Sequence, residues 1–200
     1  MSIRIKFLFL LLLLNGSAWG QPTLLVFGDS LSAAYGIARE SGWVSLLQQR
    51  VPGYRVVNAS VSGETTAGGL TRLPGVLKAH RPQLTIIELG ANDGLRGLPP
   101  RDTARNLEAM IDLAQGQGSA VLLVGMRLPP NYGLAYTVRF QELFTRVARS
   151  RQVRLVPFLL EGMANQRERF LPDGLHPDAE AQPLLLDNVL RELKPMLKEN

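Results

Sequence analysis

The sequence contains no cysteine among its 200 residues. This absence excludes a thiol nucleophile, disulfide redox chemistry, a lipid-modified N-terminal cysteine and any metal site built on thiolates. Histidine is nearly as scarce, with two residues, His80 and His176, that stand far apart. Two distant histidines and scattered carboxylates form no ligand cluster, so we expect neither a metal ion nor another cofactor.

Strong net charge and abundant aromatic residues are also missing. The formal net charge is +5, of which Arg4 and Lys6 near the N-terminus contribute two, and aromatic residues make up 6% of the chain. The basic residues are scattered and no aromatic residues stand between them, whereas nucleic-acid-binding surfaces concentrate basic side chains on one face. The sequence therefore predicts no nucleic-acid partner.

No apolar run is long enough to cross a bilayer, which needs about 20 residues. The longest run, residues 7–14, follows two basic residues and precedes a polar segment, residues 15–20, that ends in small side chains. This order is typical of a secretory signal peptide. We therefore expect residues 1–20 to be removed, with cleavage after Ala18 or Gly20. The protein is expected to be periplasmic or secreted, without a stable membrane anchor.

The remaining residues, 21–200, have the length of one domain, and we expect a monomer. Short runs of valine, isoleucine and leucine alternate there with longer amphipathic segments. This alternation predicts a doubly wound α/β sandwich, in which a parallel sheet lies between two layers of helices. The expected strands are residues 23–27, 55–58, 84–89, 120–124 and 154–157.

Small and polar residues follow the first three expected strands, at residues 28–30, 58–65 and 88–94. In such a sheet the carboxyl ends of the strands lie at one edge, where ligands bind. We therefore expect these three segments to meet in one site. The fourth strand is followed by a long loop, residues 126–133, which is suited to form a wall or a lid for a substrate.

The first of these segments, Gly28-Asp29-Ser30, has two interpretations. In one, glycine turns the chain and the polar side chains cap the helix that follows. In the other, the Ser30 hydroxyl is a nucleophile, which needs a base within hydrogen-bond reach and a group that orients this base. The rest of the sequence has to distinguish the two.

The base has two candidates. His80 stands among charged residues at the end of an expected helix, where a surface or capping role is the simpler interpretation. His176 follows Asp173 by three positions, so a helical turn would place both on one face and let the carboxylate orient the imidazole. An ordinary turn at Asp173-Gly174 is the alternative.

Acyl transfer by a serine nucleophile also needs donors for an oxyanion, and three are available. These are the backbone N–H groups of Ser30 and Gly63 and the side-chain amide of Asn92. A turn at Gly63 and a cap at Asn92 are the structural alternatives. Their joint position at successive strand ends favours a functional role.

Four segments stand in a characteristic order: residues 28–32 (Gly-Asp-Ser-Leu-Ser), 60–65 with Gly63, 90–93 (Gly-Ala-Asn-Asp) and 173–177 (Asp-Gly-Leu-His-Pro). Together they resemble the sequence blocks of the SGNH (GDSL) hydrolase family, and the resemblance covers nearly the whole chain after residue 20. It implies a three-layer fold with a flavodoxin-like sheet of five parallel strands.

The resemblance also implies a role for each of these site residues. Ser30 would be the nucleophile and His176 the base, oriented by Asp173. Gly63 and Asn92 would bind the oxyanion together with the N–H of Ser30. Ser32 replaces the last glycine of the Gly-x-Ser-x-Gly motif, which separates the chain from the α/β-hydrolases.

Residues 126–133 and 176–183 resemble the small periplasmic thioesterase, lysophospholipase and arylesterase branch of this family. This resemblance implies substrate contacts at Pro130, Asn131 and Tyr132. It also implies an exported serine esterase for small-molecule or lipid-like acyl esters and thioesters. The same active site would serve a deacetylase of cell-wall or polysaccharide sugars, and a non-catalytic ligand-binding α/β domain is an alternative of another class.

Overall fold

A computed structural model describes residues 20–197 and contains a sheet of five parallel strands in the order β2-β1-β3-β4-β5. This strand order is that of flavodoxin-like sheets, so the predicted fold class is confirmed. The signal peptide predicted for residues 1–20 lies, except for Gly20, outside the described residues. The strands are β1 (Thr23–Gly28), β2 (Arg55–Asn58), β3 (Leu84–Glu88), β4 (Ala120–Val124) and β5 (Arg154–Val156).

Six α-helices and four 3₁₀ helices connect or follow these strands within residues 20–197. The α-helices are α1 (Trp43–Arg50), α2 (Thr66–His80), α3 (Ala91–Leu95), α4 (Pro100–Gly116), α5 (Leu134–Ser150) and α6 (Gln182–Leu193). The 3₁₀ helices are η1 (Arg39–Ser41), η2 (Pro130–Tyr132), η3 (Arg167–Arg169) and η4 (Lys194–Met196).

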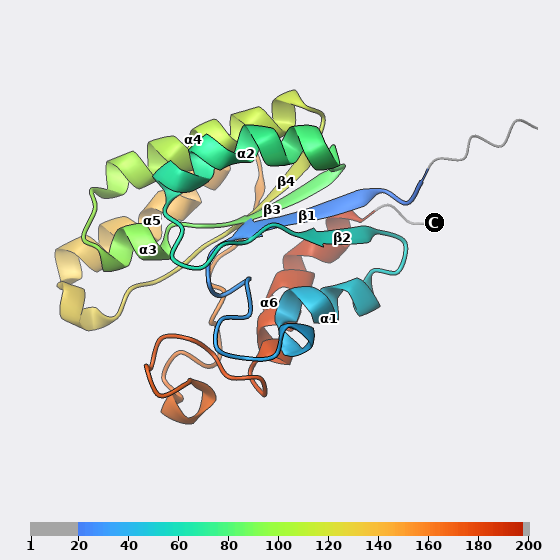
Figure 1. Ribbon diagram of the computed structural model, residues 1–200. Helices are drawn as coiled ribbons and strands as arrows, with labels where there is room; N and C mark the ends of the chain where they lie inside the picture. The colour runs from blue at the N-terminus through green and yellow to red at the C-terminus, as the bar shows by residue number, and fades with distance from the viewer. Residues whose placement is uncertain (1–19, 198–200) are drawn as a thin grey trace, which may run out of the picture.

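The helices form two layers, with α2, α4 and α5 on one face of the sheet and α1 and α6 on the other (Figure 1). Helix α4 illustrates how the sequence determines this arrangement, because its buried apolar residues recur every three to four positions at Leu107, Met110, Ile111 and Ala114. No helix within residues 20–197 is long and apolar enough to span a bilayer.

The observed strands match the predicted segments to within one residue at each end. Strand β1 extends to Gly28, while Leu89 and Pro157 lie just outside β3 and β5. The central strands β1 and β3 are buried along their whole length, as predicted for strands covered on both faces. The edge strands β2 and β5 are partly exposed because each has only one neighbouring strand.

The carboxyl ends of the five parallel strands lie at one edge of the sheet, and β1 has a special position there. It lies between β2 and β3, so the chain leaves β1 toward one side and returns as β3 on the other. Connections that diverge in this way leave a crevice at the carboxyl ends of the strands. The candidate active site lies in this crevice.

Candidate active site

Ser30 stands on a tight turn directly after β1. The strand register pairs Gly28 with Glu88 of β3, and a Cβ atom on Gly28 would lie 2.6 Å from Oε2 of Glu88. Glycine fits this position because a larger residue would displace the carboxyl group of Glu88, which occupies the space of a side chain. The turn continues with a hydrogen bond of 2.9 Å from Ala33 N to Asp29 O, and it leaves Ser30 partly exposed.

Ser30, His176 and Asp173 form a continuous chain of hydrogen bonds. Nε2 of His176 lies 2.9 Å from Oγ of Ser30, and Nδ1 of His176 lies 2.7 Å from Oδ2 of Asp173. An ionised carboxylate only accepts hydrogen bonds, so the ring proton is held on Nδ1 and Nε2 accepts from the serine hydroxyl. The structure thus brings together the three residues that the sequence suggested as nucleophile, base and orienting acid.

Asp173 and His176 are joined by a non-helical turn, the second of the two geometries that the sequence left open. Gly174 has a φ of 72°, and Oδ1 of Asp173 accepts the backbone N–H groups of Leu175 at 2.8 Å and His176 at 3.0 Å. These two backbone donors lower the pKa of Asp173 to about 2, because they stabilise the carboxylate. One carboxyl group therefore closes the turn with one oxygen and orients the imidazole with the other.

His80 lies away from this site, as its sequence context suggested. It is the last residue of α2, and Arg81 caps the helix in the left-handed conformation. Helix α2 starts close to Gly63 at the site and has 15 residues, so its two ends are about 22 Å apart. His80 is thus at the opposite edge of the sheet.

The candidate oxyanion donors come from three successive strand ends. The backbone N–H groups of Ser30 and Gly63 have no hydrogen-bond partner among residues 20–197, so both are free to bind a ligand oxygen. The Asn92 amide differs, because its nitrogen lies 3.1 Å from Oδ2 of Asp29 and 3.1 Å from the backbone oxygen of Glu64. An oxyanion at this amide would share a hydrogen with one of these acceptors.

The loop that carries Gly63 is held from two sides. Nη2 of Arg96 donates to the Gly63 backbone oxygen at 3.0 Å. The side chain of Glu64 forms an ion pair with Arg72, whose guanidinium lies 4.1 Å above the ring of Phe27. Gly63 itself has a φ of 77°, a conformation that other residues rarely adopt. These contacts hold its N–H in place before any substrate binds.

Two buried carboxyl groups, those of Asp29 and Glu88, accept hydrogen bonds from the residues of this turn. Oδ1 of Asp29 accepts the N–H of Leu31 at 3.1 Å, which fixes the turn as the sequence suggested. Oε2 of Glu88 accepts the hydroxyl of Ser32 at 2.7 Å and the N–H of Asp29 at 3.3 Å. Burial raises the pKa of Asp29 to about 6, and burial together with the neighbouring Asp29 raises the pKa of Glu88 well above its usual range.

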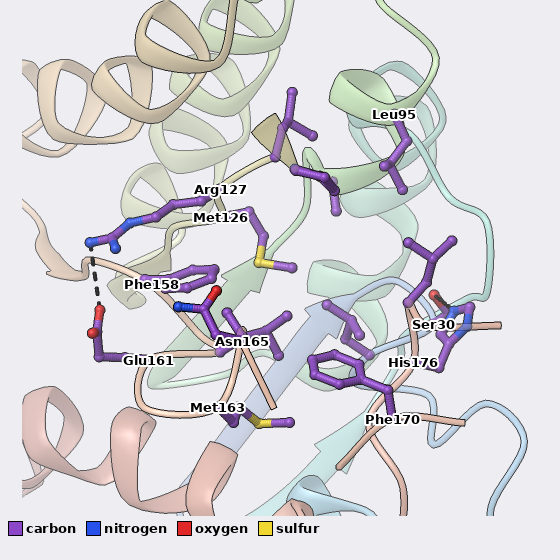
Figure 2. Close-up of a pocket in the computed structure, with 18 of the residues that line it drawn as sticks. Ser30, Leu95, Met126, Arg127, Phe158, Glu161, Met163, Asn165, Phe170 and His176 are labelled. Atoms are coloured by element: carbon purple, nitrogen blue, oxygen red, sulfur yellow. Dashed lines mark hydrogen bonds and ion pairs between the residues drawn. The ribbon is translucent and has the colours of Figure 1, made fainter. Parts of the chain in front are cut away.

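A cavity of about 660 Å³ extends from Ser30 and His176 into the protein. Figure 2 shows these two residues on one side of the cavity and the Arg127–Glu161 pair on the other. Nη2 of Arg127 lies 3.5 Å from Oε2 of Glu161, and its guanidinium lies 4.7 Å above the ring of Phe158. The apolar side chains along the cavity include Leu31, Leu95, Met126, Leu128, Phe158, Leu160, Met163, Phe170 and Leu175.

The residues implied as substrate contacts are placed differently from one another. Pro130 lines the cavity, together with the preceding residues 126–129. Asn131 and Tyr132 are not among the lining residues, and the Tyr132 hydroxyl instead donates to the backbone oxygen of Leu95 at 3.1 Å. The structure therefore places the loop beside the cavity, with one of its three named residues among those that line it.

Residues 158–170 provide the second wall of the cavity, and no prediction from the sequence included them. This segment follows β5, so the rule that ligands bind at the carboxyl ends of strands was a signal that pointed to it. Its apolar residues look like core residues in the sequence, because burial in a core and exposure to a cavity select the same side chains. Glu88 belongs to the polar segment 88–94 that the sequence indicated, but no role was predicted for its carboxyl group, although a carboxylate directly after two isoleucines of a buried strand is unusual.

Comparison with known proteins adds a family and relatives. The sequence profile of the GDSL-like lipase/acylhydrolase family matches residues 26–183. The chain is 50% identical over 191 residues to Esterase TesA of Pseudomonas aeruginosa, and the alignment covers 94% of each protein. It is 38% identical over 198 residues to thioesterase 1/protease 1/lysophospholipase L1 of Escherichia coli K12, with 98% of this chain and 95% of that protein covered. A crystal structure of TesA superposes with a TM-score of 0.85 at 50% identity and covers 88% of this chain and 99% of that one.

Proposed function

This chain belongs to the GDSL-like lipase/acylhydrolase family and is a carboxylic-ester hydrolase, and from that premise we propose an exported serine esterase that hydrolyses acyl esters and acyl thioesters. One relative is named an esterase and another a thioesterase and lysophospholipase, which supports both substrate classes. The observation that carries the proposal is the hydrogen-bonded chain from Ser30 through His176 to Asp173.

The reaction starts when Nε2 of His176 accepts the Ser30 proton while Oγ attacks the carbonyl carbon of the substrate. The tetrahedral intermediate then expels the alcohol or thiol, which takes the proton from His176, and an acyl group remains on Oγ. His176 next deprotonates a water molecule that attacks this acyl-enzyme. The carboxylic acid leaves and Oγ recovers its proton. Asp173 keeps the imidazole in the required tautomer and stabilises its positive charge in both halves of the reaction.

The oxyanion of each tetrahedral intermediate would be bound by the backbone N–H groups of Ser30 and Gly63. Both are free among the described residues, and both are held by rigid turns. The Asn92 amide would be the third donor and would share one of its hydrogens with the oxyanion. Donors that are oriented before the reaction stabilise developing charge without reorganisation.

The cavity supports acyl chains longer than acetyl. Its volume of about 660 Å³ lies in the range of ordinary ligand pockets, and an acetyl group would fill only a small part of it. Leu31, Met126, Met163 and Phe170 are among the apolar side chains that form its walls. Such walls suit an aliphatic acyl chain better than a sugar, so no observation favours the deacetylase alternative.

The cellular location and the partners are part of the same proposal. The signal-peptide pattern of residues 1–20 supports export to the periplasm or beyond it. The substrates would be small-molecule or lipid-like acyl esters and thioesters, and the enzyme would act as a monomer. Hydrolysis by this serine mechanism uses no metal ion or cofactor.

The test combines covalent labelling with hydrolysis. Diisopropyl fluorophosphate should modify the wild type once, at Ser30, and should not modify Ser30→Ala. Ser30→Ala should keep its circular dichroism spectrum and lose about 10⁴- to 10⁶-fold of kcat/KM on p-nitrophenyl esters and acyl-CoA thioesters of two to sixteen carbons. Near wild-type turnover by Ser30→Ala would remove Ser30 from the mechanism.

A further inference from the structure

The aromatic ring of Tyr35 lies against the imidazole of His176. The two ring centroids are 4.4 Å apart, and the ring planes are inclined by 40°. Both nitrogen atoms on the edge of the imidazole already have partners, Asp173 at Nδ1 and Ser30 at Nε2. Tyr35 thus contacts the part of the imidazole that these hydrogen bonds leave uncovered, its face.

Burial in the core does not explain this position of Tyr35. The side chain is 51% exposed, although it is large and aromatic. Its hydroxyl group has no hydrogen-bond partner among residues 20–197, so no hydrogen bond holds the side chain in this position either. The contact with His176 therefore has to be explained by what it does for His176.

The backbone on both sides of Tyr35 adopts unusual conformations to present this ring. Ala34 has a φ of 60° and Gly36 a φ of 76°, and the left-handed region is unfavourable for alanine. A Cβ atom on Gly36 would lie 2.5 Å from Cδ1 of Leu171, in the segment that leads to Asp173. The N–H of Tyr35 donates to the Ser30 backbone oxygen at 3.2 Å. Such local strain clusters at functional sites.

We propose that Tyr35 is a positioning residue that holds the His176 imidazole in the plane of its hydrogen bonds to Asp173 and Ser30 and stabilises the imidazolium. This inference deepens the proposed function and rests on it. His176 comes from a solvent-exposed turn, where its two hydrogen bonds hold the ring nitrogens but leave the faces of the ring without support. An aromatic ring packed against one face supports it, and its π-face attracts the positive charge that the imidazole acquires in each transition state.

A different role for Tyr35 would be that of a wall for the leaving group of the substrate. The two roles differ in the reaction steps that they affect. His176 transfers protons in both acylation and deacylation, so a residue that acts through His176 influences both steps. The leaving group departs at the end of acylation, so a residue that contacts it influences acylation alone.

The experiment measures acylation and deacylation separately, by stopped-flow kinetics with p-nitrophenyl butyrate. The variants are Tyr35→Phe, Tyr35→Leu and Tyr35→Ala, and the control is Leu113→Ala, another exposed large apolar residue, on α4. Tyr35→Ala and Tyr35→Leu should lower both rate constants about 3- to 30-fold, which matches the strength of a cation–aromatic contact, with little change in KM. Tyr35→Phe and Leu113→Ala should stay within about twofold of the wild type.

A spectroscopic measurement tests the same inference without substrate. The proton on Nδ1 of His176, in its hydrogen bond to Asp173, should give a low-field proton NMR signal. Tyr35→Ala should broaden this signal through faster exchange with water, whereas Tyr35→Phe should preserve it. Melting temperatures of all variants show whether they are folded, and Tyr35→Leu preserves most of the apolar volume.

Several outcomes would overturn the inference. Loss in acylation alone would make Tyr35 a leaving-group contact, and loss in Tyr35→Phe equal to that in Tyr35→Ala would assign the effect to the hydroxyl. Unchanged rates and an unchanged NMR signal in Tyr35→Ala would remove the residue from the mechanism while leaving the esterase proposal intact. That proposal fails separately, through activity retained by Ser30→Ala.

Discussion

Nε2 of His176 lies 2.9 Å from Oγ of Ser30, although 146 residues separate the two along the chain. Ser30 belongs to the turn after β1, and His176 belongs to the loop between β5 and α6. The two residues meet because both segments lie at the same edge of the sheet, and both residues line the candidate cavity.

The first prediction distinguishes the two histidines. His176→Ala should lower kcat/KM about 10⁴- to 10⁶-fold, because Ser30 then lacks a base in both half-reactions. His80→Ala is the matched control, since His80 ends α2 at the opposite edge of the sheet, and it should retain nearly full activity. The measurement is kcat/KM on one soluble ester for both variants. Equal losses would show that the base has been assigned wrongly.

The second prediction concerns Asp173, whose carboxylate accepts hydrogen bonds from Nδ1 of His176 and from two backbone N–H groups. Asp173→Asn should lower kcat about 10⁴-fold, because an amide at this position favours the wrong tautomer of His176. Its modification by diisopropyl fluorophosphate should slow similarly, while the circular dichroism spectrum stays that of the wild type. Wild-type turnover by this variant would reduce Asp173 to a turn residue.

The third prediction concerns the amide of Asn92. Asn92→Ala should lower kcat about 10²- to 10³-fold, which is typical for the loss of one oxyanion donor. KM should change little, because the donor acts mainly on charge that develops in the transition state. Steady-state kinetics on p-nitrophenyl esters provide both constants. An effect confined to KM would instead identify Asn92 as a contact of the bound substrate.

The fourth prediction concerns pH and the buried Glu88. Its pKa is raised in the folded protein, so the folded state binds its proton more tightly than the unfolded state does. The free energy of unfolding should therefore fall as the pH rises from about 4.5 through the raised pKa, and Asp29 acts in the same direction between about 4 and 6. Urea unfolding at pH 4 to 8 should show that Glu88→Gln loses less stability over this range than the wild type.

A control for this titration is Glu142→Gln, an exposed residue of α5. The difference in free energy of unfolding between Glu142→Gln and the wild type should vary with pH much less than the corresponding difference for Glu88→Gln. The reason is that the Glu142 side chain is in solvent in both the folded and the unfolded state. A pH dependence of Glu88→Gln that equals that of the wild type would show that the pKa of Glu88 is not raised in the folded protein, because stability depends on pH only where the folded and unfolded states bind protons differently.

Local patterns were sufficient for the strands and for much of the site. The runs of valine, isoleucine and leucine located all five strands, because a strand buried in a parallel sheet is apolar on both faces. The position of Ser30, Gly63 and Asn92 after successive strands placed them at one edge, because parallel strands end on the same side. The spacing of Asp173 and His176 suggested their contact but left its geometry open between a helical turn and an ordinary turn, and the structure has a turn with Gly174 in the left-handed conformation.

The fold class, the order of the elements and the position of polar residues at the strand ends could therefore be predicted from the sequence. Each of these features follows from patterns among residues that are close together in the chain. Tertiary structure alone decided how far Ser30 lies from His176, that Tyr35 covers the imidazole, and that residues 158–170 form a wall of the cavity. It also decided that Gly28 meets the carboxyl group of Glu88, through the register of β1 with β3. These features depend on how segments distant in sequence pack together, and the sequence pattern of a single segment carries no information about its partner.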